Sequence, residues 1–237
     1  MSHPFRPNLD AFGAFELHYA EVNDFENNCY VIVDVATGNA LIVDAADNAP
    51  AIIELVHIAT RRAADAGAAP VRVVGVLTTH RHRDHWQALE EIKAHFDVPS
   101  YAGANDAAEL PGTTEHRLSD GDTIALGEQR LDVIGLRGHT PGSVALALTT
   151  PEHPARLITG DSLFPGGIGN TFGDSDAYAQ LLGDVVERIF RRFPNETIFY
   201  PGHGLPSTLD RERGFLNTWR LQGGLPPENP SGDAYRR

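Results

Sequence analysis

The segment 79–86, THRHRDHW, constrains this chain more than any other. It places three imidazoles and one carboxylate within six residues: His80, His82, Asp84 and His85. Imidazole and carboxylate groups are common ligands of divalent transition metals. Without an ion, the side chains of this cluster would have only one another and water as partners. The segment therefore predicts a metal site, and any fold of the chain has to present these four side chains from one short stretch.

The residues around this cluster predict a strand before it and a helix after it. Residues 71–77 (VRVVGVL) form a β-branched apolar run, which is typical of a strand buried on both faces. The apolar residues of 86–96 follow helical spacing, so Asp84 or His85 is expected to open a helix, with Trp86 as a core residue. Ligand sites of α/β sheets gather at the carboxyl ends of strands, so the metal is expected on a loop between two packed elements.

The rest of the chain shows strand and helix patterns in two halves. Strands are expected at 15–20, 29–34, 40–43, 123–126, 130–136, 144–149, 157–159 and 197–200, and helices at 47–67 (capped by Asp47 or Asn48), 176–193 and 209–221. This order of strands and helices predicts an α/β fold, a sandwich of two sheets with helices outside. Residues 1–222 are expected to form one domain, and the Pro/Gly-rich residues 223–237 a poorly ordered tail.

Composition limits the partners and the compartment. The formal net charge is −13 and no Lys/Arg cluster is long enough to make a basic face, which argues against a nucleic-acid partner. No apolar stretch approaches the length of a membrane span and the first residues lack a secretory pattern, so a cytoplasmic protein without membrane contact is expected. Cys29, the single cysteine, is expected to be a buried structural thiol. The oligomeric state is left open.

Three downstream segments offer further metal ligands. His139 lies in GHTPGS, Asp161 in TGDSLF and His203 in PGHG, and each follows a predicted strand. In each segment a small residue that lets backbone approach closely precedes the ligand. These residues are candidates to complete the coordination that His80 and His82 begin. The remaining histidines lack this setting and are expected to be surface or internally bonded residues: His3, His18, His57, His95, His116 and His153.

In this order, THRHRDHW, GHTPGS, TGDSLF and PGHG resemble the metallo-β-lactamase superfamily, and more narrowly its glyoxalase II (hydroxyacylglutathione hydrolase) branch. The resemblance runs from about residue 15 to residue 206 and implies an αββα sandwich with a binuclear metal site. It implies one ion held by His80, His82 and His139, a second held by Asp84, His85 and His203, and Asp161 as the bridge between them.

This ligand set implies two divalent ions. Zn²⁺ is the default for His and Asp ligands, and Fe or Mn suits the same atoms. Two close ions can lower the pKa of a bound water, polarise a carbonyl and hold a leaving group. The expected function is therefore a binuclear metal-dependent hydrolase, a glyoxalase II-like thioesterase that cleaves a small acyl-thiol thioester with a metal-bound hydroxide. Asp84 is assigned a catalytic role besides its role as a ligand.

Two features beyond the ligands are assigned roles. In the related proteins an aspartate at the end of the strand matching 40–43 commonly supports the metal loop, so Asp44 is expected to do so here, with a simple strand-end cap as the alternative. The glycine-rich loop 163–173 is expected to form a wall of the substrate pocket, because it starts beside a ligand. A phosphate-cradling loop is the competing interpretation, but the lysine of such loops is absent.

The candidate substrate contacts in this loop are Phe164, Asn170 and Phe172. Glyoxalase II enzymes that use glutathione carry a lysine and a tyrosine near the positions of Asn170 and Phe172. They also have a larger helical domain than the residues after PGHG provide. These departures favour a small carrier thiol other than glutathione.

Three other functions stay open. A lactone hydrolase would use the same ligands but needs a proton donor for the leaving alkoxide, for which Tyr178 and Tyr200 are candidates. A persulfide dioxygenase resembles this fold but uses one iron, and an intact second site at Asp84, His85 and His203 counts against it. A non-catalytic metal module would close its coordination, usually with cysteine, whereas this site leaves a position for water.

Overall fold

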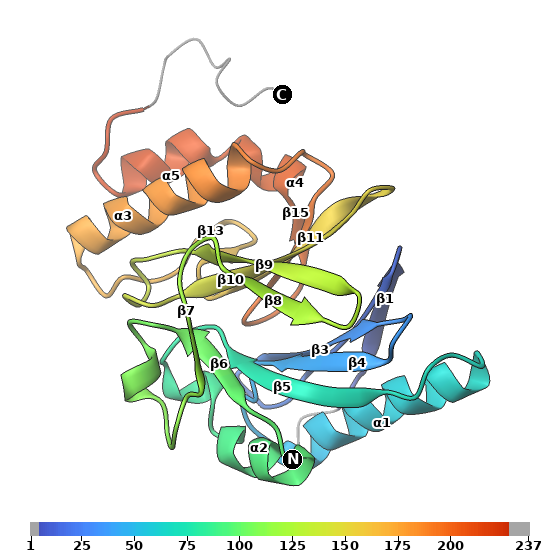
Figure 1. The fold of residues 1–237 in the computed structure, drawn as a ribbon. Helices are drawn as coiled ribbons and strands as arrows, with labels where there is room; N and C mark the ends of the chain where they lie inside the picture. The colour runs from blue at the N-terminus through green and yellow to red at the C-terminus, as the bar shows by residue number, and fades with distance from the viewer. Residues whose placement is uncertain (1–4, 228–237) are drawn as a thin grey trace.

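Two β-sheets pack face to face, and helices cover their outer faces (Figure 1). The computed structural model describes residues 5–227. Within them the first sheet has seven strands in chain order, antiparallel from β1 to β4 and parallel from β4 to β7. They span Asn8–Phe12 (β1), Phe15–Glu21 (β2), Asn28–Asp34 (β3), Asn39–Val43 (β4), Arg72–Thr78 (β5), Ser100–Gly103 (β6) and His116–Leu118 (β7).

The second sheet has six strands in the order β15-β14-β11-β10-β9-β8 within the described part of the chain. All neighbours are antiparallel except β11 and β14. The strands are Thr123–Leu126 (β8), Gln129–Gly135 (β9), Val144–Thr150 (β10), His153–Gly160 (β11), Ile198–Pro201 (β14) and Ser207–Thr208 (β15). A small separate ribbon pairs β12 (Leu163–Phe164) with β13 (Gly167–Ile168).

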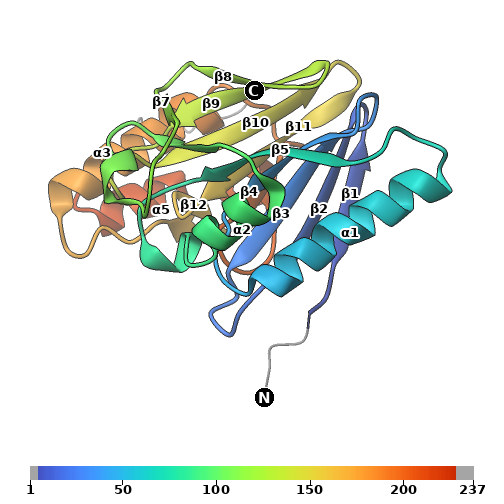
Figure 2. The ribbon, with the colours of Figure 1, turned by 60° about the horizontal axis from the view of Figure 1, so that its bottom comes forward.

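The helices divide between the two outer faces (Figures 1 and 2). The first sheet is covered by α1 (Ala49–Asp65) and α2 (Leu89–Phe96), and the second by α3 (Ser175–Val185), α4 (Leu209–Arg213) and α5 (Leu216–Gln222). The chain continues from α3 through a π-helical turn at Val186–Phe190. The predicted αββα sandwich is therefore confirmed.

Three apolar layers follow from this stacking, and β3 shows why its sequence is continuously apolar. Every residue of β3 is buried, because alternate side chains serve two different cores. Tyr30 and Ile32 pack between the sheets, whereas Val31 and Val33 pack toward α1 and α2. Cys29 lies in the same outer layer, fully buried, and burial together with Asp44 raises the pKa of its thiol. The expectation of a buried thiol is confirmed.

The predicted strands match the structure to within one residue at each end, except 157–159, which belongs to the longer β11. Strands β1, β6, β7 and β15 escaped prediction because they are short and mix polar with apolar residues. The predicted helix at 209–221 is broken, with Gly214 following α4 and Phe215 preceding α5. The predicted side-chain cap of α1 is wrong. Asn48 precedes this helix in a left-handed conformation with a φ of 54° and makes no capping hydrogen bond.

The helix expected to begin at Asp84 or His85 begins later. A 3₁₀ turn spans Arg83–His85 and α2 starts at Leu89. Trp86 lies between them, partly buried against two apolar clusters, and its indole N–H donates to the carbonyl of Arg81 at 2.8 Å. The apolar spacing predicted a helix here because it continues through the turn. The loop that carries His80 to His85 instead forms a 3₁₀ turn, which is tighter than an α-helix and orients its side chains differently.

Residues 223–227, the described start of the predicted tail, follow α5, and Leu225 packs on the outer core of the second sheet. Residues 228–237, the rest of that predicted tail, lie outside the described residues. Among residues 5–227 no helix combines the length and the hydropathy needed to cross a bilayer.

Gly103, at the end of β6, is the point where the first sheet meets the loop after β9, and it supplies a test of the fold. A Cβ atom there would lie 1.9 Å from the carbonyl oxygen of Gly142, whereas a Cβ on the helical Gly183 would meet nothing within 4 Å. Gly103→Ala should lower the free energy of unfolding by about 1–3 kcal/mol through overpacking. Gly183→Ala, the control, should leave it unchanged or raise it by about 0.5–1 kcal/mol. Thermal and denaturant unfolding measure both, and equal stability of the two variants would contradict this packing.

Candidate metal centre

The seven predicted ligands lie at one end of the sandwich, each just past the carboxyl end of a strand. The cluster from His80 to His85 follows β5 in the first sheet. His139, Asp161 and His203 follow β9, β11 and β14 in the second sheet. The strand order of the two sheets therefore brings together residues that lie as far apart in the sequence as His80 and His203.

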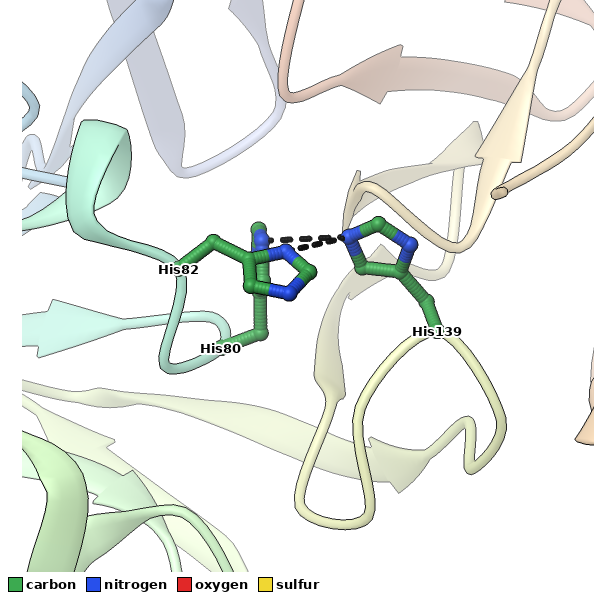
Figure 3. A group of neighbouring side chains, drawn as sticks. All are labelled: His80, His82 and His139. Carbon is green, nitrogen blue, oxygen red and sulfur yellow. Dashed lines mark hydrogen bonds between the residues drawn. The ribbon is translucent and has the colours of Figure 1, made fainter. Parts of the chain in front are cut away.

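The first ligand group consists of His80, His82 and His139, whose rings converge (Figure 3). Nε2 of His139 lies 2.9 Å from Nδ1 of His82 and 3.3 Å from Nε2 of His80. One nitrogen of each ring lies within 4.8 Å of the others, as ligands of a single ion must. The geometry brings together the three residues predicted to hold the first ion.

The second group consists of Asp84, His85 and His203. Nε2 of His203 lies 3.3 Å from both Oδ2 of Asp84 and Nε2 of His85. Asp161 lies between the groups, with Oδ1 3.3 Å from Nε2 of His85 and Oδ2 3.6 Å from Nε2 of His139. One carboxylate thus reaches ligands of both groups, which is the position that a bridging ligand requires.

The outward nitrogens of four of these rings are held by the protein. His80 contacts the Thr79 hydroxyl at 3.1 Å, His85 the Asp44 carboxylate at 2.8 Å, His139 the Asn170 carbonyl at 2.7 Å and His203 the Phe25 carbonyl at 2.8 Å, each through Nδ1. A carbonyl oxygen only accepts, so the N–H of such a ring points outward and Nε2 faces the centre. Hydrogen bonds of this kind fix the ring orientation that metal-binding histidines need.

The first group is arranged to receive a cation. Burial, reinforced by His85, lowers the pKa of His80 well below its ordinary value, and burial also lowers the pKa of His82 and His139. These rings are therefore neutral near pH 7, and lone pairs of His80 and His139 face each other across 3.3 Å. Facing lone pairs repel unless a positive charge lies between them, so these residues fit a divalent metal ion.

The second group carries its positive charge on its own side chains. Burial opposes charge on His85 and His203, but Asp44 and Asp161 outweigh it at His85 and raise the pKa of that ring well above its ordinary value. At His203, Asp161 and Asp84 raise the pKa to about 10. The hydrogen bond from His203 lowers the pKa of Asp84, and His203 with His85 overcomes burial to lower the pKa of Asp161. Protons thus stand where a metal ion would bind, and the donor set fits that ion too.

Asp44, the residue expected to support the metal loop, is fully buried and left-handed, with a φ of 57°. Its carboxylate accepts hydrogen bonds from the backbone N–H of Thr79 at 2.7 Å and from the Thr79 hydroxyl at 2.9 Å. It also accepts from Nδ1 of His85 at 2.8 Å. This carboxylate therefore orients one ligand ring and fixes the backbone just before another, a larger task than a strand-end cap performs.

Two residues that escaped the sequence analysis also hold the centre. Asp106 is fully buried and accepts from the backbone N–H of Arg81 at 3.1 Å, from Gly142 at 2.9 Å and from the Thr140 hydroxyl at 2.5 Å. It thereby joins the loop of His80 to the loop of His139. Asp106 follows a short polar strand end with no ligand motif, so no sequence signal marked it.

Asn27 is the second residue of this kind. Its side-chain Nδ2 donates to Oδ2 of Asp84 at 3.1 Å and lies 3.3 Å from Nε2 of His203. Its backbone also forms an isolated β-bridge with His203. The amide thus covers the second ligand group from the side of the N-terminal strands, where nothing in the sequence around it predicts a site.

The predicted substrate loop flanks both ligand groups. The ring of Phe172 lies 5.6 Å from that of His82, and the ring of Phe164 lies 6.4 Å from that of His203. Phe172 is 70% exposed, with a left-handed φ of 56°. The Asn170 side chain accepts from the backbone N–H of Phe172 at 2.7 Å, so it shapes the loop. These residues form apolar margins around the ligands.

The candidate tyrosines lie elsewhere. The hydroxyl of Tyr178 donates to the carbonyl of Trp219 at 2.9 Å, and that of Tyr200 donates to Asp10 at 2.5 Å. Burial, with Asp10, raises the pKa of Tyr200, and burial raises that of Tyr178. Both candidate hydroxyls thus donate to groups other than the ligands, and neither has a hydrogen bond to a ligand group among the described residues.

The histidines expected not to be ligands behave as anticipated where they are described. His18 is buried and bonds Glu16 at 3.0 Å, and four are exposed: His57, His95, His116 and His153. His3 lies outside the described residues.

The family model of the metallo-beta-lactamase superfamily matches residues 22–203, which include all seven predicted ligands. The chain belongs to the metallo-beta-lactamase superfamily. It is 32% identical over 179 residues to a hydroxyacylglutathione hydrolase of Gloeobacter violaceus (strain ATCC 29082 / PCC 7421), covering 75% of this chain and 64% of that relative. The chain therefore spans slightly less than two thirds of the length of that relative.

Two solved structures share the fold. The crystal structure of BLEG-1 B3 metallo-beta-lactamase has a TM-score of 0.66 and 24% identity, covering 83% of this chain and 95% of the other. The structure of TTHA1623 in a di-iron-bound form has a TM-score of 0.60 and 25% identity, covering 81% of this chain and 94% of the other. Members of the superfamily are metal-dependent hydrolases, so this is the class in which the chain falls.

The contacts of Asp44 predict how the metal affinity responds to a single substitution. Asp44→Asn should weaken metal binding by about 10–100-fold, because His85 loses the carboxylate that orients its ring. Asp34→Asn is the matched control, since Asp34 is equally buried and accepts from Thr37 and Glu128 away from the ligands. Competition with a chromophoric chelator measures the affinity. Equal affinities of the two variants would contradict the role of Asp44.

The raised pKa values of His85 and His203 predict proton release on metal binding. At pH 7 both rings of the metal-free protein hold a proton that an incoming ion must displace, so Zn²⁺ should release about two protons per chain. Calorimetric titration in two buffers of different ionisation enthalpy counts them. His203→Ala should release about one proton fewer. Binding without proton release would show that these rings are neutral before the ion arrives.

Proposed function

We propose that this protein is a binuclear metal-dependent hydrolase of the glyoxalase II kind that cleaves the thioester of a small acyl-thiol. The observation that carries the proposal is the position of Asp161 within 3.6 Å of ligand atoms in both groups, which suits two ions sharing one carboxylate. The relative named hydroxyacylglutathione hydrolase supports the same reaction. A cytoplasmic setting, in which carrier thiols stay reduced, belongs to the proposal.

The chemistry that two bound divalent ions supply is activation of a water and polarisation of a carbonyl. The residues of this chain would position the reactants around it. Asp84 has the most exposed carboxylate of the site, at 39%, and its lowered pKa keeps it ionised at neutral pH, as a ligand beside the incoming water requires. Phe164 and Phe172 flank the ligands and exclude bulk water from the acyl group.

A thioester suits this site better than a lactone. A thiolate leaves without a strong acid, because thiols have a pKa near 8.5, whereas an alkoxide must be protonated as it leaves. The hydroxyls of Tyr178 and Tyr200 are bonded to Trp219 and Asp10, away from the ligands. The absence of either tyrosine from the centre therefore favours the better leaving group.

Zn²⁺ is the metal we propose, as the default for His and Asp ligands, with iron or manganese as alternatives for the same donors. The similar protein TTHA1623 was solved in a di-iron-bound form, so iron is a real alternative. Metal analysis of the purified protein separates the functions that the sequence left open. Two ions per chain would support the hydrolase, and one iron per chain would support the dioxygenase.

A panel of acyl-thioesters and lactones tests the proposed reaction. Metal-loaded protein should hydrolyse thioesters faster than lactones, measured by thiol release and by acid production. His82→Ala should lose at least about 100-fold in kcat/KM, since it removes a ligand rather than an outer partner. His57→Ala, an exposed histidine on α1, is the matched control and should keep full activity. Absence of turnover on every thioester of the panel would overturn the proposal.

A further inference from the structure

A pocket of about 450 Å³ adjoins the first ligand group and is lined by two arginines. Arg81 and Arg137 share it with His139 and Phe172, and the amides of Asn105 and Gln180 also line it. The volume falls in the range of small-molecule sites. The pocket connects a metal ligand to two guanidinium groups, so its contents would contact both.

The backbone of Arg81 is fixed by hydrogen bonds, whereas its guanidinium has no close carboxylate partner among the described residues. The backbone N–H of Arg81 donates to Asp106 at 3.1 Å, and its backbone carbonyl accepts from the indole of Trp86 at 2.8 Å. Among the described residues its nearest carboxylate is also Asp106, 4.0 Å from Nε, and the side chain is 38% exposed. A guanidinium held beside a metal ligand without a close ionic partner is ready to bind an anion.

Arg137 is fixed in a complementary way. Nε and Nη2 each donate to the carboxylate of Asp184 at 2.9 Å, which fixes the plane of the guanidinium, and within residues 5–227 its Nη1 group makes no hydrogen bond. Asp184 also lies 3.4 Å from Nε of Arg188, which is itself paired with Asp120 at 3.0 Å. The pair with Asp184 therefore fixes the orientation of the Arg137 guanidinium beside the pocket.

One carboxylate, that of Asp174, also lines the pocket, and it is hydrogen-bonded to the N-terminus of a helix. Asp174 caps α3, and its Oδ1 accepts from the backbone N–H groups of Asp176 and Ala177 at 2.9 Å each. That contact places its negative charge at the positive end of a helix. The protein as a whole carries a formal net charge of −13, and this pocket brings two of its arginines together beside a metal-ligand candidate.

We propose that Arg81 and Arg137 bind an anionic group, a carboxylate or a phosphate, on the carrier thiol of the substrate. The acyl group would then extend past Phe172 to the ligand groups. This inference rests on the proposed thioesterase function and narrows its substrate to thioesters of negatively charged carriers. Guanidinium groups suit this task because their forked donors match the oxygens of a carboxylate or phosphate.

Carriers that differ in charge test the specificity. The acetyl thioesters of 3-mercaptopropionate, phosphopantetheine and neutral N-acetylcysteamine form the panel, and the anionic carriers should show a kcat/KM at least about 10-fold higher. Arg81→Gln should remove this preference through KM and leave the neutral carrier unaffected, and Arg81→Lys should restore part of it. Arg83→Gln is the matched control, because Arg83 is exposed in the same loop and does not line the pocket. Equal preference in wild type and Arg81→Gln would overturn the inference.

A binding measurement separates this inference from the proposed function. Metal-free protein is titrated with succinate and with inorganic phosphate by NMR, and no turnover is needed. Binding that is lost in Arg81→Gln and kept in Arg83→Gln supports the anion site even when no thioester is hydrolysed. The stronger of the two probes indicates whether carboxylate or phosphate is the natural group. Equal binding by both variants, or none by the wild type, rejects the site.

Discussion

The electrostatic balance between converging imidazoles and carboxylates governs this end of the sandwich. Asp161 and Asp84 face His203 and His85 within 3.6 Å, and the lone pairs of the first group face one another. Such groups are stable together only when positive charge lies among them, either as protons or as a metal ion. Because these side chains come from loops of both sheets, that charge also determines how closely the two sheets can approach at this edge.

Buried carboxylates behind the ligands make this arrangement rigid. Asp44 fixes the backbone after β5 and the ring of His85, and Asp106 joins the loops of the two sheets. Small residues allow the close approach, since a Cβ on Gly202 would lie 2.1 Å from Oδ1 of Asp161. Four of the ligand rings are therefore oriented by hydrogen bonds to side-chain and backbone groups behind them.

Site residues that lie in short sequence motifs could be predicted from the sequence. His80 to His85 lie side by side in the chain and each further candidate follows a recognisable strand, so these residues could be found in advance, whereas their division into two groups came from the family resemblance. Asn27 and Asp106 could not, because each acts through contacts with segments remote in sequence. The start of α2 was misplaced since apolar spacing records burial alone, and the 3₁₀ turn before it is set by the direction of the ligands.

The placement of the ligands on both sheets has a consequence for the order of assembly. Residues up to His85 belong to the half of the chain that forms the first sheet, and His139, Asp161 and His203 belong to the half that forms the second. Neither half of the chain alone contains all the ligands predicted for one ion and the bridging Asp161 as well. Metal binding is therefore expected to follow docking of the sheets, and ions bound there would cross-link the two halves and slow their separation.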